Sequence, residues 1–309
     1  MKLSVVSTFK MMLKKIVGRH IAHERRDWAI CVYFVDNPLS ADIKFCSESP
    51  SILGDNVSDV NAAFVADPFL VQRGENEFYL FYEIFNTDTN KGEIAFSKST
   101  DGTRWEYQKV ILSENYHLSY PYVFRSENDY FMIPESSQDY SVKLYKAVEF
   151  PAKWEYVKTL LSGYHFADAS IFKHKGYWWL FVSTRENDTL NLYYADSIYG
   201  PWSLHKKSPL IRNNLSIARP GGRVVEIESK LYRIAQNCNG YYGKNISIFE
   251  IVEISTDEYK EKLVNESFLK ESNKGSWNSK GMHHMDCVKV ADRKWLVSVD
   301  GFGNFGRYG

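Results

Sequence analysis

The sequence predicts an all-β fold, a five-bladed β-propeller of four-stranded blades, with a short amphipathic helix at the N-terminus. Three observations lead to this prediction. A unit of strands recurs about every fifty residues, a spacing in the range of propeller repeats. Within each unit the apolar residues alternate with a period near two, as in strands and unlike helices. Four strands per unit is the pattern of a propeller blade. A β-sandwich or a pair of small β-domains would explain the strands but not the recurrence.

Each copy of the unit opens with a polar or charged residue inside a short apolar strand. A strand dense in aromatic residues follows, then an alternating strand, and often a tryptophan in a fourth strand. The turns between the third and fourth strands carry suitable residues, as in Asp101-Gly102 and Tyr199-Gly200-Pro201. The copies begin with ADPFLV (66–71), YPYVFR (120–125), ADASIFK (167–173), ARPGGRVVEI (218–227) and HHMDCVKV (283–290).

The fifth copy contains only two clear strands, 283–290 and 294–301. A closed ring has to fill the missing positions, because closure removes exposed sheet edges. The segment 27–35, DWAICVYFV, is the expected donor. The predicted organisation is therefore a basic segment, 1–26, followed by one propeller domain, 27–309.

Residues 1–26 combine apolar residues at helical spacing with several lysines and arginines. Lys10, Lys14 and Lys15 interrupt the apolar stretch that a secretory signal requires. A basic amphipathic helix of this kind either lies on an anionic membrane surface or packs on the propeller. We therefore expect a cytoplasmic protein, with association at the inner membrane face as an open alternative.

Composition and charge indicate which kinds of ligand or partner the protein binds. The formal net charge is zero, whereas a nucleic-acid-binding protein normally carries a basic surplus. Aromatic residues make up 16% of the chain, which suits strands and also sugar-binding surfaces. The cysteines are scattered and lack the close pairs typical of zinc ligands. We expect reduced thiols, no metal and no other cofactor. The cysteines are Cys31, Cys46, Cys238 and Cys287.

Repeat geometry predicts where a site would lie. The first strand of each blade lines the central channel of a propeller, so polar residues near the starts of these strands should converge at one mouth. These residues are Asp67, Tyr120, Tyr122, Asp168, Arg219, Arg223, His283, His284 and Asp286. Residues at or just beyond the ends of the second strands should border the same pocket. They are Glu83, Glu135, Arg185 and Gln236.

These residue types suit glycosyl transfer, which needs one carboxyl group as proton donor and another as base, nucleophile or charge stabiliser. Asp67, Asp168 and Glu135 are the predicted catalytic carboxyl groups. Arg219 and Arg223 could clamp a carboxylate or phosphate through forked hydrogen bonds, and the remaining residues are predicted to contact substrate.

Structural roles compete with these functional ones. Asp67 could cap a turn, Glu135 could satisfy buried backbone groups, and Arg219-Pro-Gly-Gly-Arg223 could be a bulge. The adjacent histidines His283 and His284 point to opposite faces of a strand, which argues against a shared metal ion and for one inward-facing acid–base histidine.

The ADPFL stretch and the similar ADASIF stretch in the third copy resemble the five-bladed propellers of glycoside hydrolase family 43. The whole series ADPFL, YPYVF, MIPES, DASIF and ARPGGR more closely resembles the N-terminal propeller domain of plant glucosamine inositolphosphorylceramide transferases. Stand-alone bacterial relatives of that domain occur among surface-glycan genes. The resemblance covers about residues 60–300, and its motifs are specific only as a set.

The family 43 resemblance implies that Asp67 is the base-like carboxylate and that Asp168 is the orienting, pKa-tuning one. In blade four, however, Arg219 stands in the strand where those hydrolases present an acidic glutamate. Glu135 or His284 would have to supply that proton, which puts simple hydrolysis in question.

Three functions remain open. A transferase acting on an activated sugar or lipid-linked glycan in surface polysaccharide or glycolipid synthesis is favoured by the arginines, the basic N-terminal segment and the closer resemblance. A hydrolase of the family 43 type is favoured by Asp67 and Asp168. A non-catalytic glycan-binding propeller is the third, because in the plant proteins a separate catalytic domain follows the propeller.

Overall fold

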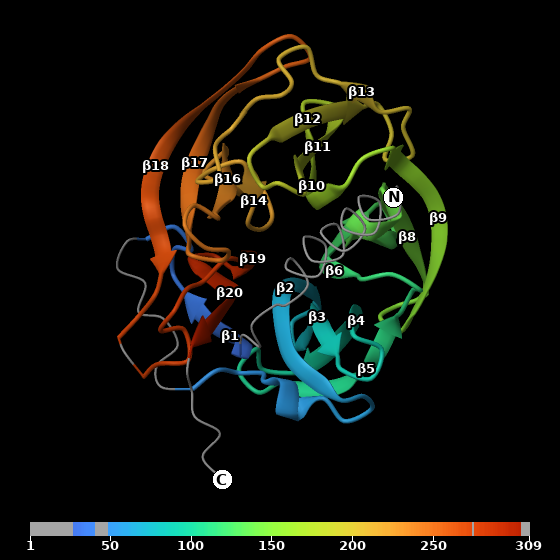
Figure 1. The fold of residues 1–309 in the computed structure, drawn as a ribbon, viewed down its shortest axis with the longest axis vertical. Helices are drawn as coiled ribbons and strands as arrows, with labels where there is room; N and C mark the ends of the chain where they lie inside the picture. The colour runs from blue at the N-terminus through green and yellow to red at the C-terminus, as the bar shows by residue number, and fades with distance from the viewer. Residues whose placement is uncertain (1–26, 41–48, 274, 304–309) are drawn as a thin grey trace, which may run out of the picture.

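A computed structural model describes residues 27–40, 49–273 and 275–303. The predicted amphipathic helix in residues 1–26 lies outside the described residues. The rest forms five antiparallel sheets around a common axis, with strands β2, β6, β10, β14 and β19 nearest the centre (Figure 1). This confirms the predicted five-bladed propeller. Among the described residues no helix is both long and apolar enough to span a bilayer.

Blades one to three each contain four strands, in chain order from the axis outward. Blade one comprises β2 (Ala62–Gly74), β3 (Glu77–Asn86), β4 (Lys91–Ser99) and β5 (Glu106–Leu112). Blade two comprises β6 (Ser119–Ser126), β7 (Asp129–Ser136), β8 (Ser141–Glu149) and β9 (Lys153–Ser162). Blade three comprises β10 (Phe166–His174), β11 (Tyr177–Thr184), β12 (Leu190–Ala195) and β13 (Ser203–Leu204).

The inner strand of blade four is broken into two pieces that both pair with the second strand. At the break, Gly222 has a φ of 148° and forms a bridge with Met285 of blade five. A Cβ atom at this position would lie 1.8 Å from the Met285 carbonyl oxygen, so only glycine fits. The strands are β14 (Arg219–Pro220), β15 (Val225–Ile227), β16 (Lys230–Asn237), β17 (Asn245–Ile254) and β18 (Tyr259–Lys270).

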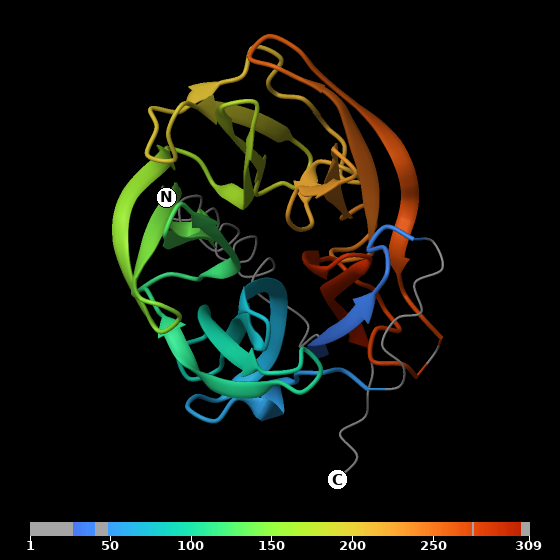
Figure 2. The ribbon, with the colours of Figure 1, turned by 180° about the vertical axis from the view of Figure 1, so that it is seen from behind.

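Blade five joins both ends of the described chain. Its strands run in the order β19 (Met285–Ala291), β20 (Lys294–Gly303) and β1 (Asp27–Val35). Strand β1 pairs antiparallel with β20 along its whole length, and the two lie side by side in Figure 2. An isolated bridge between Ile30 and Ile52 lies on the other edge of β1. Two short 3₁₀ helices, η1 (Gly54–Asn56) and η2 (Ser137–Asp139), complete the structure.

Aromatic side chains fill the space between neighbouring blades. The rings of Phe124 in blade two and Trp178 in blade three have centroids 5.7 Å apart. Phe81 in blade one meets Trp154 in blade two edge to face at 5.8 Å. Such pairs add to the stabilisation from apolar burial. They fix the blades relative to one another, and with them the inner strands that carry the polar residues.

One prediction about the cysteines is wrong. Cys31, in β1, is disulfide-bonded, whereas four reduced thiols were expected. Cys238 and Cys287 are buried thiols, and Cys46 lies outside the described residues. Cysteine spacing alone does not reveal a pairing of this kind.

Candidate functional site

A bulge recurs at the same place in the inner strands of blades one, two and three. The register of pairing to the second strand shifts there, between Ala66 and Phe69 in blade one and at the equivalent points of the other two. In each bulge a non-glycine residue adopts a left-handed backbone conformation: Asp67 (φ 54°), Tyr120 (φ 45°) and Asp168 (φ 49°). This conformation costs of order 1 kcal/mol per residue, so the surroundings must hold it. A bulge re-aims the side chain, here away from the blade and toward other blades.

Carboxyl groups of neighbouring blades hold these bulges through their backbone N–H groups. The Asp67 N–H donates to Asp300 Oδ2 at 2.9 Å, and the Tyr120 N–H donates to Asp67 Oδ2 at 3.2 Å. The Asp168 N–H donates to Glu135 Oε2 at 3.2 Å. The contacts therefore pass from blade five to blade one, to blade two and to blade three. Asp67, Asp168 and Glu135, predicted from separate repeats, are brought into one buried network.

Arg219 of blade four joins this network. Its guanidinium donates to Asp168 through Nε (2.5 Å, Oδ2) and Nη2 (3.1 Å, Oδ1), and Nη2 also reaches Glu135 Oε2 at 3.1 Å. Nη1 donates to Asn187 Oδ1 at 2.6 Å, and the Tyr242 ring lies 5.1 Å from Cζ. The fork expected to clamp a ligand's carboxylate or phosphate is thus occupied by the chain's own carboxyl groups.

His283 lies between two carboxyl groups. Its Nδ1 is 2.7 Å from Asp300 Oδ1 and its Nε2 is 3.5 Å from Asp67 Oδ1. The Trp28 ring of β1 packs against the imidazole, with ring centroids 4.0 Å apart, and Tyr242 meets it edge on at 5.2 Å. Asp300, Trp28 and Tyr242 were not predicted, because none of them stands at the repeat positions from which the site residues were predicted.

Asp67, His283 and Asp300 lie close enough together to suggest a metal site. Asp300, however, accepts four hydrogen bonds, from the backbone N–H groups of Asp67, His283 and His284 and from His283 Nδ1. Three of these bonds reach Oδ1 and one reaches Oδ2, so both oxygens already serve as hydrogen-bond acceptors within the protein. Hydrogen bonds account for this cluster, and we assign no metal ligands to it.

The carboxyl groups of the network differ in how strongly they hold a proton. Burial, and then the nearby Asp168, Asp300 and Glu83, raise the pKa of Asp67 well above its ordinary value. Burial raises the pKa of Glu135 to about 8, although Arg219 opposes this. Burial would also raise the pKa of Asp300, but the contacts with His283 hold it below its ordinary value. Asp300 is therefore ionised at neutral pH, whereas the environments of Asp67 and Glu135 both favour the protonated form.

Glu83 and Gln236 lie at the edge of this network, where each contacts a histidine. Glu83 Oε1 is 3.2 Å from His117 Nε2, and His117 Nδ1 accepts the Gly92 N–H at 2.8 Å. Because Nδ1 is an acceptor, the proton of a neutral His117 lies on Nε2 and points at Glu83. Gln236 donates to the His283 carbonyl oxygen at 3.5 Å. Both predicted side chains are buried and satisfied within the protein.

An aromatic cluster lies next to the network and contains three predicted site residues, Tyr120, Tyr122 and His284. The Tyr120 hydroxyl donates to the Gly222 carbonyl oxygen at 3.0 Å, and that of Tyr122 donates to the Ile171 carbonyl oxygen. The His284 ring packs edge on against Tyr120, and its Nε2 is 3.0 Å from the Pro68 carbonyl oxygen. These groups tie blades one to five together.

His284 was predicted as a candidate acid. Burial lowers its pKa to about 4, so the ring is neutral at neutral pH. Nδ1 then carries no proton and has no hydrogen-bond partner, while the Nε2 proton is directed at the Pro68 carbonyl oxygen. This arrangement gives the acid role of His284 no support.

Arg223 and Asp286, predicted to bind substrate, bind each other. Arg223 Nε is 2.8 Å from Asp286 Oδ1 and Nη2 is 3.2 Å from Oδ2. Nη2 also donates to the Val123 carbonyl oxygen at 3.0 Å, and the Leu70 N–H donates to Asp286 at 2.7 Å. The pair thus links blades four, five, two and one. Arg185, by contrast, is exposed on the turn after β11.

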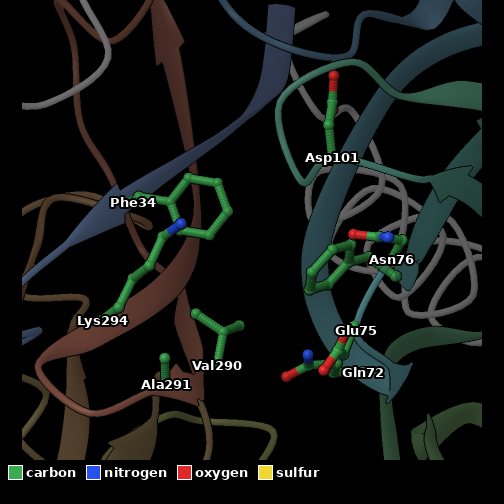
Figure 3. A pocket seen from close by; sticks show the side chains of 9 residues that line it. Phe34, Gln72, Glu75, Asn76, Asp101, Val290, Ala291 and Lys294 are labelled. Carbon is green, nitrogen blue, oxygen red and sulfur yellow. The ribbon is translucent and has the colours of Figure 1, made fainter.

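A cavity of about 300 Å³ lies apart from the predicted site residues, between blades one and five (Figure 3). It lies at the β2–β3 and β19–β20 hairpins, where Lys294 approaches the Phe34 ring to 4.3 Å from its centroid. Its lining consists of Phe34, Gln72, Glu75, Asn76, Phe78, Asp101, Val290, Ala291 and Lys294. None of the residues predicted from the repeats belongs to it.

Residues 22–302 match the family model described as glucosamine inositolphosphorylceramide transferase 1, N-terminal. A protein of that name from Oryza sativa subsp. japonica is 35% identical over 321 aligned positions, which cover 96% of this chain and 43% of the rice protein. The Arabidopsis thaliana protein of the same name is 37% identical over 254 positions, covering 79% and 33%. The chain thus spans less than half the length of these curated relatives.

Solved structures share the fold at low sequence identity. The catalytic domain of a family 62 α-L-arabinofuranosidase from Coprinopsis cinerea superposes with a TM-score of 0.58 at 12% identity, covering 89% of this chain and 96% of that one. An exo-β-1,3-galactanase from Clostridium thermocellum gives a TM-score of 0.54 at 17% identity, covering 72% and 51%. These similarities concern the five-bladed propeller and not the reaction.

Proposed function

Because the chain belongs to the family of N-terminal domains of glucosamine inositolphosphorylceramide transferase 1, we propose that its propeller is a carbohydrate-active enzyme that transfers a glycosyl unit at the axial network. One observation carries the proposal. Two carboxyl groups of the network, the half-buried Glu135 and the buried Asp67, have contrasting partners: Glu135 lies beside Arg219 and Asp67 beside His283. Carboxyl pairs in contrasting environments are how glycosyl-transferring sites separate acid from base.

Glu135 is the proposed acid. Its raised pKa, about 8, leaves the carboxyl protonated at neutral pH, ready to protonate the oxygen of a leaving group. Its side chain is 13% exposed, compared with 2% for Asp168, so it is the better placed of the two to meet a ligand. Arg219 holds both carboxyl groups and fixes the position of Glu135.

Asp67 is the proposed base, which takes the proton of the attacking hydroxyl group. Its Oδ2 is fixed by the Tyr120 N–H, and its Oδ1 faces His283. Asp168 is the proposed orienting group, because it shares Arg219 with Glu135 and its own N–H donates to Glu135. The left-handed bulges give Asp67 and Asp168 equivalent positions in blades one and three.

We further propose that the donor is an activated sugar and the product a surface glycan or glycolipid. The transferase name of the relatives and the arginine in blade four, at a position where a carboxyl acid was expected, support transfer over hydrolysis. Arg219 is occupied, so the exposed Arg185 is the proposed contact for a donor phosphate. The cytoplasmic location and a membrane contact through residues 1–26 stay predictions. The disulfide at Cys31 argues against the cytoplasmic prediction, because disulfides persist mainly in oxidising compartments.

A binding-only propeller is the second candidate, favoured by the full occupation of Arg219 and by the match to only part of the curated relatives. Thermal-shift screening against nucleotide sugars, sugar phosphates and neutral oligosaccharides separates the candidates. We expect a nucleotide sugar to raise the melting temperature of the wild type and of Arg104→Gln, an exposed control, but not of Arg185→Gln. Stabilisation by neutral oligosaccharides alone, equal in all three proteins, would favour the binding module.

A further inference from the structure

Asp300 has no place in the proposed function, yet it is wholly buried and accepts four hydrogen bonds. It belongs to β20, three positions before the end of that strand. Together with His283 and Asp67 it forms a row, carboxylate–imidazole–carboxyl, that runs from blade five to blade one. Such a row is able to move a proton toward or away from Asp67.

Burial raises the pKa of Asp67 well above its ordinary value, so Asp67 needs a proton acceptor before it can act as a base. We propose that His283 is that acceptor: His283 Nε2 takes the Asp67 proton, and Asp300 stabilises the resulting imidazolium. This inference rests on the proposed role of Asp67 as base and extends it to two residues that act through Asp67. In this proposal His283 acts on Asp67 by holding its proton. Asp300 acts one step further away, because it orients the His283 ring.

The contacts of the imidazole support this assignment. Nδ1 is 2.7 Å from Asp300 Oδ1, and that carboxylate can only accept, so Nδ1 carries a proton. Nε2 faces Asp67 Oδ1 at 3.5 Å. A ring with a carboxyl oxygen at each nitrogen donates to both only as imidazolium. Low dielectric strengthens both attractions, because His283 is only 2% exposed.

The ring is also held in one orientation. Trp28 packs on its face at 4.0 Å and Tyr242 meets it edge on at 5.2 Å. The backbone of Gly243 packs closely against Trp28 and restricts its movement. A Cβ atom at Gly243 would lie only 2.6 Å from the Trp28 ring. A histidine that is fixed in this way and hydrogen-bonded to a buried aspartate has the arrangement by which catalytic histidines are oriented.

His284 offers an internal comparison. It adjoins His283 in sequence, and its Nδ1 is 3.9 Å from the same Asp67 oxygen. Its other nitrogen faces a neutral carbonyl oxygen, that of Pro68, rather than a carboxylate. Asp300 also lies near His284 and accepts its backbone N–H, but only one ring nitrogen of His284 faces a carboxyl group, so the ring lacks the second partner that would stabilise an imidazolium. The proton-holding role therefore falls to His283.

With the shared proton on His283, the ionised Asp67 accepts the proton of the attacking hydroxyl group or water. The oxygen of that group uses a lone pair to bond to the anomeric carbon. The donor's carbon–oxygen bond breaks with its electron pair going to the leaving oxygen, which takes the proton of Glu135. Asp67 then loses its new proton to solvent, and Glu135 regains one.

Nitrogen-15 NMR of histidine-labelled, full-length protein tests the protonation state directly, with His283→Gln used to assign the signal. At pH 7 we expect both nitrogens of His283 to be protonated in the wild type. In Asp300→Asn and in Asp67→Asn, which remove one carboxylate each, we expect a neutral ring at the same pH. A neutral His283 in the wild type would overturn the proposal, as would an imidazolium that persists in both variants.

Activity provides a second, separable readout. Asp300→Asn and His283→Gln should lower kcat by about 10²-fold with a smaller change in KM. His205→Gln, which replaces another buried histidine in blade three, should leave kcat within about twofold. Failure to detect any turnover would defeat the proposed function and leave the NMR result standing. Full kcat in Asp300→Asn would contradict the role of this residue.

Discussion

Asp168 and Arg219, from blades three and four, form a two-point ion pair in which Nε is 2.5 Å from Oδ2 and Nη2 is 3.1 Å from Oδ1. The same guanidinium reaches Glu135 of blade two. One positive charge therefore gathers two carboxyl groups from two other blades. Instead of presenting a charge to a ligand, Arg219 determines which carboxyl groups lie together and which of them meets solvent.

Replacing Arg219 by glutamine should destabilise the fold by about 3–5 kcal/mol, because it leaves the buried Asp168 without its cation and Glu135 without a hydrogen-bond donor. Urea unfolding measures this loss. Arg73→Gln, which breaks the exposed pair with Glu77, is the matched control and should cost less than about 1 kcal/mol. Equal losses in the two variants would show that the pair of Arg219 stabilises no more than a surface contact.

Glu135 should make the stability of the fold depend on pH. Its pKa rises from an ordinary 4.5 to about 8, so the folded state holds the proton more tightly than the unfolded state. The stabilisation is then complete below pH 4.5 and disappears as the pH rises through 8. Glu135→Gln should reduce the loss of unfolding free energy between pH 5 and pH 8 by on the order of a few kcal/mol.

The control for that measurement is Glu149→Gln, an exposed carboxyl group paired with Lys153. Its pH dependence should follow that of the wild type between pH 5 and 8. A Glu135→Gln curve that runs parallel to the wild-type curve over this range would contradict the assignment of the buried proton to Glu135.

Gly222 should tolerate no side chain. An added Cβ atom would lie 1.8 Å from the Met285 carbonyl oxygen, and the φ of 148° already disfavours other residues. We expect Gly222→Ala to lower the melting temperature strongly, through a shift of blade five against blade four. Gly163→Ala is the control, with a positive φ of 103° but nothing within 4 Å, and should cost only about 1 kcal/mol. Similar melting temperatures in the two variants would show that the bridge to Met285 is dispensable.

His284 should not contribute a proton to the reaction. Its pKa of about 4 keeps it neutral at neutral pH, and its Nε2 faces a backbone carbonyl oxygen. We expect His284→Asn to change the melting temperature more than the pH profile of kcat. If this substitution removes the alkaline limb of that profile while the fold stays intact, Glu135 is not the acid.

Much of this arrangement follows from repeat position. The spacing of the copies predicts the five blades, and the equivalence of Asp67, Tyr120 and Asp168 predicts that these residues approach one another. The partners could not be predicted in the same way. Asp300 lies at the end of a second strand and Trp28 on the strand that closes the ring, so their contacts depend on how blade five meets blade one.

The hydrogen-bond partners of Arg219 could not be predicted from the sequence either, because they come from three different segments of the chain. A sequence shows that an arginine stands at a blade start but not whether a carboxyl group from the next blade reaches it. The same holds for Arg223 and Asp286, which are each equivalent to a site position yet satisfy each other. The position of a residue in the repeat therefore predicts where its charged group lies. It does not predict whether that group is free to bind a ligand.

The central claim is that Glu135 and Asp67 transfer a glycosyl unit, and product analysis of the stabilising donor tests it most directly. The sugar donor that raises the melting temperature is incubated with wild type, Glu135→Gln and Asp67→Asn, and the products are resolved by mass spectrometry. We predict that the wild type consumes the donor and that both variants bind it but turn it over at least about 10²-fold more slowly. A donor that binds all three proteins and is never consumed, or is consumed equally by all three, would contradict the account.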